Sequence, residues 1–381
     1  MIYFDNAATS LHKPKSVALA VYDAINTLGN SGRGADGPSL EAARVAFETR
    51  EALAQLFGIR DCSRIAFTSN ATESLNMAIK GLIKPGDHII TTQWEHNSVL
   101  RPLFELENKG VELTMIKSDS FGRTCLSSVE HSIRDNTRAI VCTHSSNVTG
   151  NVLDIESIGN ICQEHELLFI LDAAQTAGVF PIHVKEQKID VLCFSGHKGL
   201  LGPQGTGGLY VREGLSPTPL MRGGSGIETF SRSHPTVMPE ALEAGTLNIH
   251  GIAGMLAGIK YIRRTGLDTI RQKEQRLAWE FYLGVRTIPG VKIYGDFSTP
   301  NRCGIVALNI WDYDSALIVD LLAETYKIYT RGGGHCAPLM HQALGTQDRG
   351  VVRFSFSHFN TMKEITCGIQ AVEEIASKLN G

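Results

Sequence analysis

The sequence predicts an α/β fold built on a mostly parallel sheet covered by helices. Short β-branched runs alternate with longer stretches of helical periodicity, which is the pattern of strands joined by crossover helices. At 381 residues the chain exceeds the roughly 250 to 300 residues at which a single core stops growing, so two domains are expected. A composition of 43% hydrophobic and 20% charged residues excludes wholesale disorder. The net charge of −3 predicts no affinity for nucleic acid or anionic lipid.

Six apolar, β-branched runs are the predicted strands. They cover residues 88–92, 111–116, 138–143, 167–171, 191–194 and 208–211. Residues 40–57 predict an amphipathic helix with Ser39 as its cap, because apolar side chains recur near one face. Those side chains are Leu40, Ala43, Phe47, Leu53 and Phe57. A glycine-rich region gives way to helical periodicity near residues 261–266, which predicts a domain boundary. No apolar run reaches the ~18 residues of a membrane span.

Polar side chains follow four of these strands at the point where each strand ends. The polar segments are residues 94–97, 144–147, 172–175 and 195–198. Because ligands bind at the carboxyl ends of the strands in open α/β sheets, the four segments are expected to meet. The sequence therefore predicts one site at this edge of the sheet.

Lys198 and Asp172 are the most informative pair at this edge. Lys198 follows Ser195 and His197 on a tight turn; a surface lysine is the ordinary interpretation, but a pocket that lowers the pKa makes lysine a nucleophile for carbonyl groups. Asp172 ends a buried run 26 residues earlier, where it either caps a turn or pairs with the pyridinium nitrogen of pyridoxal phosphate. The two together favour a pyridoxal phosphate site.

A phosphate group needs a cradle, and residues 69–74 open a predicted helix whose free N–H groups attract anions. Asn70 or Thr72 as an ordinary helix cap is the alternative. His96 either stacks on a flat cofactor ring or is a satisfied histidine at a strand end. The thirteen histidines show no His-Glu-x-x-His spacing, so no metal site is predicted.

Eight cysteines are widely spaced and form no Cys-x-x-Cys pair, and the N-terminus lacks a signal peptide pattern. A reducing cytoplasm is therefore the expected compartment. Cys336 differs from the others because it follows three glycines, and Arg331 and His335 nearby can favour a thiolate; a buried inert thiol is the alternative. Arg353 lies in an alternating strand, where it either forms an edge salt bridge or captures a carboxylate.

These residues are part of an ordered set of motifs that resembles the cysteine desulfurases, which belong to the class V aminotransferases among the fold type I pyridoxal phosphate enzymes. The motifs lie at residues 3–9, 69–74, 95–96, 146–150, 171–175, 194–203, 243–246 and 331–337. The last one resembles the group II branch, although Gly334 stands where many of those enzymes have a histidine. The resemblance implies a seven-stranded, mostly parallel sheet in a large domain of residues 16–262. It also implies a small α+β domain of residues 1–15 with 263–381.

Carried over position by position, the resemblance implies a role for each site residue. Lys198 holds the cofactor covalently and moves the Cα proton, His96 stacks on the ring, and Asp172 pairs with the ring nitrogen. Gln175 and Asn147 hydrogen-bond near the phenolic oxygen and the substrate, and Arg353 with Arg331 binds the substrate carboxylate. The residues that hold the phosphate are Ala71, Thr72, Ser195, His197 and, from the second subunit of a homodimer, Thr246.

The implied reaction converts L-cysteine to L-alanine and leaves a persulfide on Cys336, from which an acceptor protein takes the sulfur. Three alternatives remain at this level. They are a selenocysteine lyase acting on L-selenocysteine, a cysteine or cystine β-lyase releasing pyruvate, and a non-catalytic pyridoxal-phosphate-binding sulfur carrier.

Overall fold

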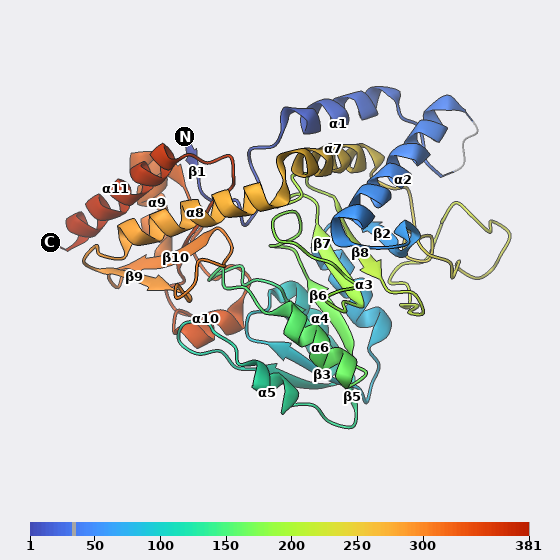
Figure 1. The fold of residues 1–381 in the computed structure, drawn as a ribbon, viewed down its shortest axis with the longest axis horizontal. Coiled ribbons are helices and arrows are strands. Elements are labelled where there is room, and N and C mark those ends of the chain that lie inside the picture. Colours follow the sequence, from blue (N-terminus) through green and yellow to red (C-terminus); the bar gives the residue numbers. More distant parts are fainter. Residues whose placement is uncertain (33–35, 381) are drawn as a thin grey trace.

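The computed structural model describes residues 1–32 and 36–380, and a seven-stranded sheet forms its centre (Figure 1). The strands lie in the order β2-β8-β7-β6-β5-β3-β4. Their bounds are β2 Ile65–Thr68, β3 His88–Thr92, β4 Glu112–Ile116, β5 Thr137–Thr143, β6 Leu168–Asp172, β7 Val191–Ser195 and β8 Gly207–Val211. Strand β8 pairs antiparallel with β2 and β7, and β7, β6, β5, β3 and β4 pair parallel. The expected α/β class is confirmed.

The six predicted strands are all present, each within one residue of its expected bounds at either end. Strand β2 was not predicted. It has four residues and lies directly before the motif at residues 69–74.

Helix α2 spans Gly37–Phe57, and two details of its prediction are wrong. The cap is Asp36, whose Oδ1 accepts a hydrogen bond from the Ser39 N–H at 2.8 Å. Of the residues predicted on its apolar face, Leu40 and Phe47 are 48% and 53% exposed and Ala43 is exposed too. Leu53 and Phe57 are buried, together with Ala42, Ala46, Ala52 and Ala54.

Helices cover both faces of the sheet. Helices α2, α6 (Ile155–Glu164) and α7 (Ile249–Thr265) contribute to the core on one face, and α3 (Ala71–Leu82) and α4 (Asn97–Glu107) to the core on the other. Helix α1 (Lys15–Thr27) packs on α7, and α5 is Leu126–Glu130. Among the described residues, no helix is long and apolar enough to cross a membrane.

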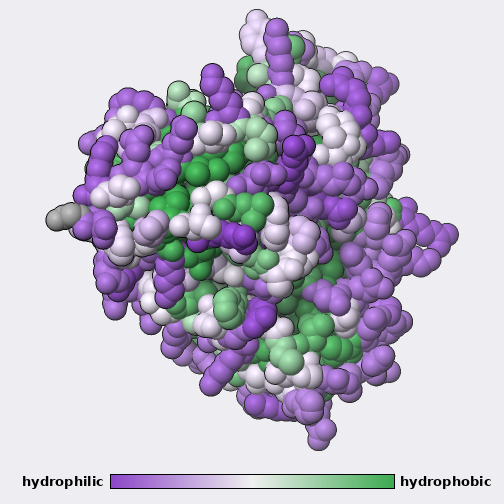
Figure 2. Space-filling view, turned by 60° about the vertical axis from the view of Figure 1, so that its left-hand side comes forward, coloured by the Kyte–Doolittle hydropathy of each residue, from purple (hydrophilic) through white to green (hydrophobic). Residues whose placement is uncertain are grey.

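A second, antiparallel sheet in the order β12-β10-β9 lies at the other end of the molecule (Figure 1). Its elements and their neighbours are α8 Leu267–Val285, β9 Val291–Tyr294, β10 Ile305–Ile310, α9 Ser315–Tyr326, α10 Pro338–Leu344, β12 Val352–Ser355 and α11 Met362–Leu379. The N-terminus joins this end, since β1 (Ile2–Tyr3) pairs with β11 (Ile328–Tyr329). Figure 2 turns this end of the molecule forward. Hydrophobic side chains gather near the middle of the face that it shows, and most of the surrounding surface is hydrophilic. Gly266, with a φ of 90°, separates α7 from α8, while the division at residues 262 and 263 stays a prediction.

Candidate active site

A cavity of about 320 Å³ lies at the carboxyl ends of β3, β5, β6 and β7. Nine of the ten predicted cofactor residues line it: Ala71, Thr72, His96, Asn147, Asp172, Gln175, Ser195, His197 and Lys198. The expected convergence of strand ends is therefore correct. Asn70, Ala8 and Ala174, which lie in segments already singled out from the sequence, also line it. The lining residues that sequence reasoning missed are Leu75, Ser98 and Thr143.

Lys198 and Asp172 face this cavity from neighbouring strands. The surrounding protein lowers the pKa of the Lys198 amine to about 8, a shift that the nearby Asp172 carboxylate opposes. Asp172 is almost fully buried, which raises its pKa, and it accepts a hydrogen bond from the Ala174 N–H at 2.8 Å. The amine is thus easily deprotonated for bond formation. The second Asp172 oxygen accepts no hydrogen bond from the described residues, so it can pair with a ring nitrogen.

The N-terminus of α3 forms one wall of the cavity. Asn70 is its cap and accepts a hydrogen bond from the Glu73 N–H at 3.0 Å, so the capping interpretation is confirmed. The Ala71 N–H donates to Ser195 Oγ at 3.1 Å, and the Thr72 and Ser98 hydroxyls lie 2.7 Å apart. Hydroxyl and N–H groups therefore gather at the positive end of a helix, as an anion site requires.

His96 caps α4 with its ring. Its Nδ1 accepts a hydrogen bond from the Ser98 N–H at 3.1 Å and lies 2.8 Å from Ser98 Oγ. Burial, with further contributions from Lys198 and Arg353, lowers the pKa of His96 to about 4. The ring is therefore neutral and fixed in orientation, which suits stacking on a flat cofactor.

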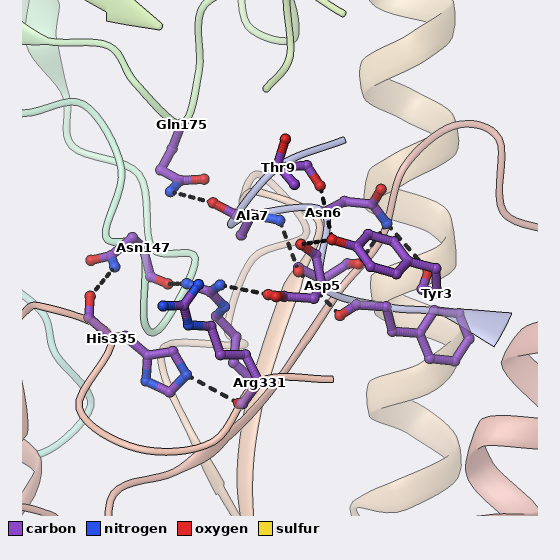
Figure 3. A network of polar contacts seen from close by, with 12 residues as sticks. Tyr3, Asp5, Asn6, Ala7, Thr9, Asn147, Gln175, Arg331 and His335 are labelled. Carbon is purple, nitrogen blue, oxygen red and sulfur yellow. Dashed lines mark hydrogen bonds and ion pairs between the residues drawn. The ribbon is translucent and has the colours of Figure 1, made fainter. Parts of the chain in front are cut away.

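Arg353 links the N-terminal segment to Asn147, which lines the cavity. Figure 3 shows Asp5 and Asn147 within one network of polar contacts. Its guanidinium lies 2.8 Å from Asp5 Oδ1, and Nη1 donates to the Asn147 carbonyl at 2.9 Å. The predicted salt bridge thus exists, but it is buried, and Nε has no hydrogen-bond partner within the described residues. Arg331 pairs with Arg353 through backbone hydrogen bonds. Burial, with a contribution from the Arg331 charge, lowers the pKa of Arg353, so the two positive charges act on one another. This surplus of positive charge suits a substrate carboxylate.

The Cys336 loop is tied to the same rim. The Asn147 side-chain amide donates to the His335 carbonyl, and the Asn97 N–H donates to the Cys336 carbonyl, both at 2.7 Å. His335 and Cys336 have φ angles of 48° and 55°, which are left-handed conformations that non-glycine residues rarely adopt. Cys336 is exposed, whereas His335 is buried and burial lowers its pKa well below the usual value. His335 is therefore neutral and brings no positive charge to Cys336, while a role of Arg331 and His335 in favouring the thiolate stays a prediction.

The N-terminal segment contributes to the site in a way that sequence reasoning missed. The Ala7 carbonyl accepts a hydrogen bond from the Gln175 amide at 3.2 Å, and the Thr9 hydroxyl lies 3.0 Å from His197 Nδ1. Lys13 donates to the His197 carbonyl at 3.4 Å. The motif at residues 3–9 was the available signal, because it stood out although no strand or helix was predicted there.

Thr246 is the one predicted cofactor residue outside the cavity. It is exposed and lines a separate cleft with Arg50 and Glu243.

Comparisons with known proteins agree with this geometry. The family model described as aminotransferase class V matches residues 2–367. A probable cysteine desulfurase of Methanothermobacter thermautotrophicus is 34% identical over 98% of this chain and 94% of its own length. One of Pyrococcus abyssi is 35% identical, over 100% of this chain and 95% of its own length.

Solved structures are also similar. The apo structure of a cysteine desulfurase from Thermococcus onnurineus is 36% identical, with a TM-score of 0.93 over 99% of this chain and 95% of that one. The cysteine desulfurase CsdA from Escherichia coli is 28% identical, with a TM-score of 0.89 over 99% and 94%.

Proposed function

Because this chain belongs to the class V aminotransferases, a pyridoxal-phosphate-dependent family, we propose that it is a cysteine desulfurase with Cys336 as the sulfur acceptor. The observation that carries this proposal is the attachment of the Cys336 loop to the cavity rim. Asn147 contacts both the loop and Arg353, and Asn97 follows directly on His96. These contacts support a site in which the nucleophile and the carboxylate-binding arginine lie next to the cavity that Lys198 lines.

The cavity residues fit pyridoxal phosphate. The Asn147 Oδ1 atom is buried without a hydrogen-bond partner among the described residues, and Asp172 has an oxygen available for the ring nitrogen. Lys198 Nζ would hold the aldehyde carbon, and Thr72, Ser195 and His197 with the Ala71 N–H would hold the phosphate. When bound, the cofactor withdraws electrons from the substrate Cα and so makes its proton acidic.

Each remaining step uses groups of this chain. Arg353, with Arg331 beside it, binds the substrate carboxylate and orients Cα toward Lys198, whose amine takes and returns the Cα proton. The Cys336 Sγ forms an S–S bond to the substrate sulfur as the Cβ–S bond breaks. The electron pair of the broken bond stays on carbon, which takes up a proton, so the products are alanine and a Cys336 persulfide.

The proposal includes a homodimer in which Thr246 reaches the cofactor phosphate of the second copy. It is supported by the position of Thr246 outside its own cavity and by large apolar side chains exposed on α1 and α2. These side chains are Leu19, Tyr22, Ile25, Leu40 and Phe47. Apolar surface of this kind suits burial against another subunit. A cytoplasmic location, supported by eight free cysteines, and a sulfur-accepting protein that receives the persulfide complete the proposal.

The test is product analysis with L-cysteine, L-selenocysteine and L-cystine, on the wild type and on Cys336→Ala. A desulfurase releases alanine and sulfide from L-cysteine in the presence of a thiol, and Cys336→Ala abolishes this turnover. Undiminished turnover of L-selenocysteine by the variant assigns a selenocysteine lyase activity, because selenium leaves more readily. Pyruvate in place of alanine contradicts the proposal in favour of a β-lyase.

A further inference from the structure

A buried ion pair outside the cavity has no role in the reaction as described so far. Arg50, on α2, directs Nη2 to both carboxylate oxygens of Glu243 at 2.7 and 2.6 Å. The two side chains are only 12% and 6% exposed. Glu243 is the first residue of the motif at residues 243–246, and Thr246 is the last. Only Thr246 has a role in the function proposed above.

Both members of the pair are also attached to β2, which is an edge strand of the large sheet. The Phe67 N–H donates to Glu243 Oε1 at 2.7 Å, and Arg50 Nε donates to the Ile65 carbonyl at 3.1 Å. The Arg50 guanidinium lies over the Phe67 ring, 4.6 Å from its centroid. Both ion-pair partners therefore hydrogen-bond to the β2 backbone, which makes this end of the motif a rigid anchor.

The other end of the motif is anchored independently. Asn248 caps α7 by accepting a hydrogen bond from the Gly251 N–H at 3.0 Å, and its amide donates to the Gly205 carbonyl at 2.9 Å. Between the two anchors lies Thr246, whose side chain is exposed and contacts no hydrogen-bonding group in the described part of this chain. A short segment held at both ends presents its middle residue in one place.

We propose that Arg50 and Glu243 are positioning residues that present Thr246 to the cofactor phosphate of the second copy. The inference rests on the homodimer of the proposed function. The reason is entropic: a hydroxyl on a segment already held at both ends loses little freedom when it binds the phosphate. Without the ion pair the segment is mobile before binding, and ordering it costs free energy each time the phosphate binds.

The first experiment compares pyridoxal phosphate with pyridoxal, which lacks the phosphate, on the purified apoprotein. Glu243→Gln keeps an oxygen for the Phe67 N–H but removes the charge that holds Arg50, and it is expected to weaken pyridoxal phosphate binding about ten-fold. Pyridoxal binding is expected to change less than two-fold. With saturating cofactor, kcat for L-cysteine is expected to stay within two-fold of wild type. Glu112→Gln, in an ion pair with both side chains about half exposed, is the matched control and is expected to change neither affinity.

The second experiment asks in which subunit Glu243 acts, using hybrid dimers with one functional site. When Glu243→Gln is on the chain that also carries Lys198→Ala, the remaining functional site faces the altered segment and pyridoxal phosphate binding weakens. When Glu243→Gln is on the chain with an intact Lys198, the affinity stays near that of wild type. The opposite pattern overturns the inference, because Glu243 then acts on its own site through β2.

Two further results separate this inference from the proposal on which it rests. If Thr246→Ala binds pyridoxal phosphate as tightly as wild type, or if the holoenzyme sediments as a monomer, the dimeric site itself is wrong. If Thr246→Ala weakens binding but Glu243→Gln weakens pyridoxal and pyridoxal phosphate equally, only the positioning role is wrong. Arg50→Lys keeps a cation and replaces Glu243→Gln if that variant fails to fold. It is also expected to weaken the binding of pyridoxal phosphate more than the binding of pyridoxal.

Discussion

The hydrogen bond from the Asn97 N–H to the Cys336 carbonyl allows a clean test of how the sulfur acceptor is held. Asn97 is the first residue of α4, where proline is tolerated because its N–H has no partner within the helix. The preceding residue, His96, has an extended backbone with φ −70° and ψ 154°, which proline also permits. Asn97→Pro therefore deletes this one hydrogen bond and leaves α4 intact.

The expected loss follows from the strength of one hydrogen bond. A bond of 2.7 Å between neutral backbone groups contributes about 1 kcal/mol, and its loss lets the left-handed Cys336 leave its position. About 1 kcal/mol corresponds to a roughly five-fold lower kcat for alanine formation. The KM for L-cysteine is expected to stay within about two-fold, because Arg353 and Lys198 are unchanged.

The assay is steady-state alanine formation from L-cysteine with saturating thiol, and the control is Asn97→Ala, which keeps the N–H. Melting temperatures of the two variants establish that both are folded. Equal kcat values for Asn97→Pro and Asn97→Ala would refute the reasoning, since the hydrogen bond then has no part in placing the thiol.

Three other outcomes test the electrostatics of the site. Asp5→Ala leaves Arg353 buried without its carboxylate and is expected to lower the free energy of unfolding by about 3 kcal/mol. Removal of the exposed Asp312, which pairs with Arg349, is expected to lower it by less than about 1 kcal/mol. Equal losses of the two variants in urea unfolding contradict this. Because the pKa of Lys198 is about 8, covalent binding of pyridoxal phosphate to the apoprotein is expected to accelerate with pH up to about 8 and then level off; stopped-flow absorbance measures this, and acceleration continuing to pH 10 contradicts it. Burial raises the pKa of Glu95 from 4.5 to about 8, so its contribution to stability is present below pH 4.5 and is lost as the pH rises to 8. Glu95→Gln is therefore expected to gain stability relative to wild type over that interval, and a constant difference in unfolding free energy contradicts the assignment.

The sequence by itself determined the sheet and the chemistry at its edge. Buried parallel strands are recognisable from local composition, and the residues that follow them meet because the strands run in one direction. Lys198 and Asp172 could be paired from the sequence alone, since Asp172 stands at the end of β6 and Lys198 just after the neighbouring β7. The edge strand β2, which has four residues, was not predicted.

Only the tertiary structure decided which distant groups share a charge or a hydrogen bond. Asp5 and Arg353 are 348 residues apart, and no periodicity relates them. The neutrality of His335 likewise follows from its burial, which depends on packing by the rest of the molecule. Thr246 lies outside the cavity for the same kind of reason, because the anchors at Glu243 and Asn248 set its position. Local sequence specifies the conformation of short segments, whereas long-range packing decides what each side chain touches.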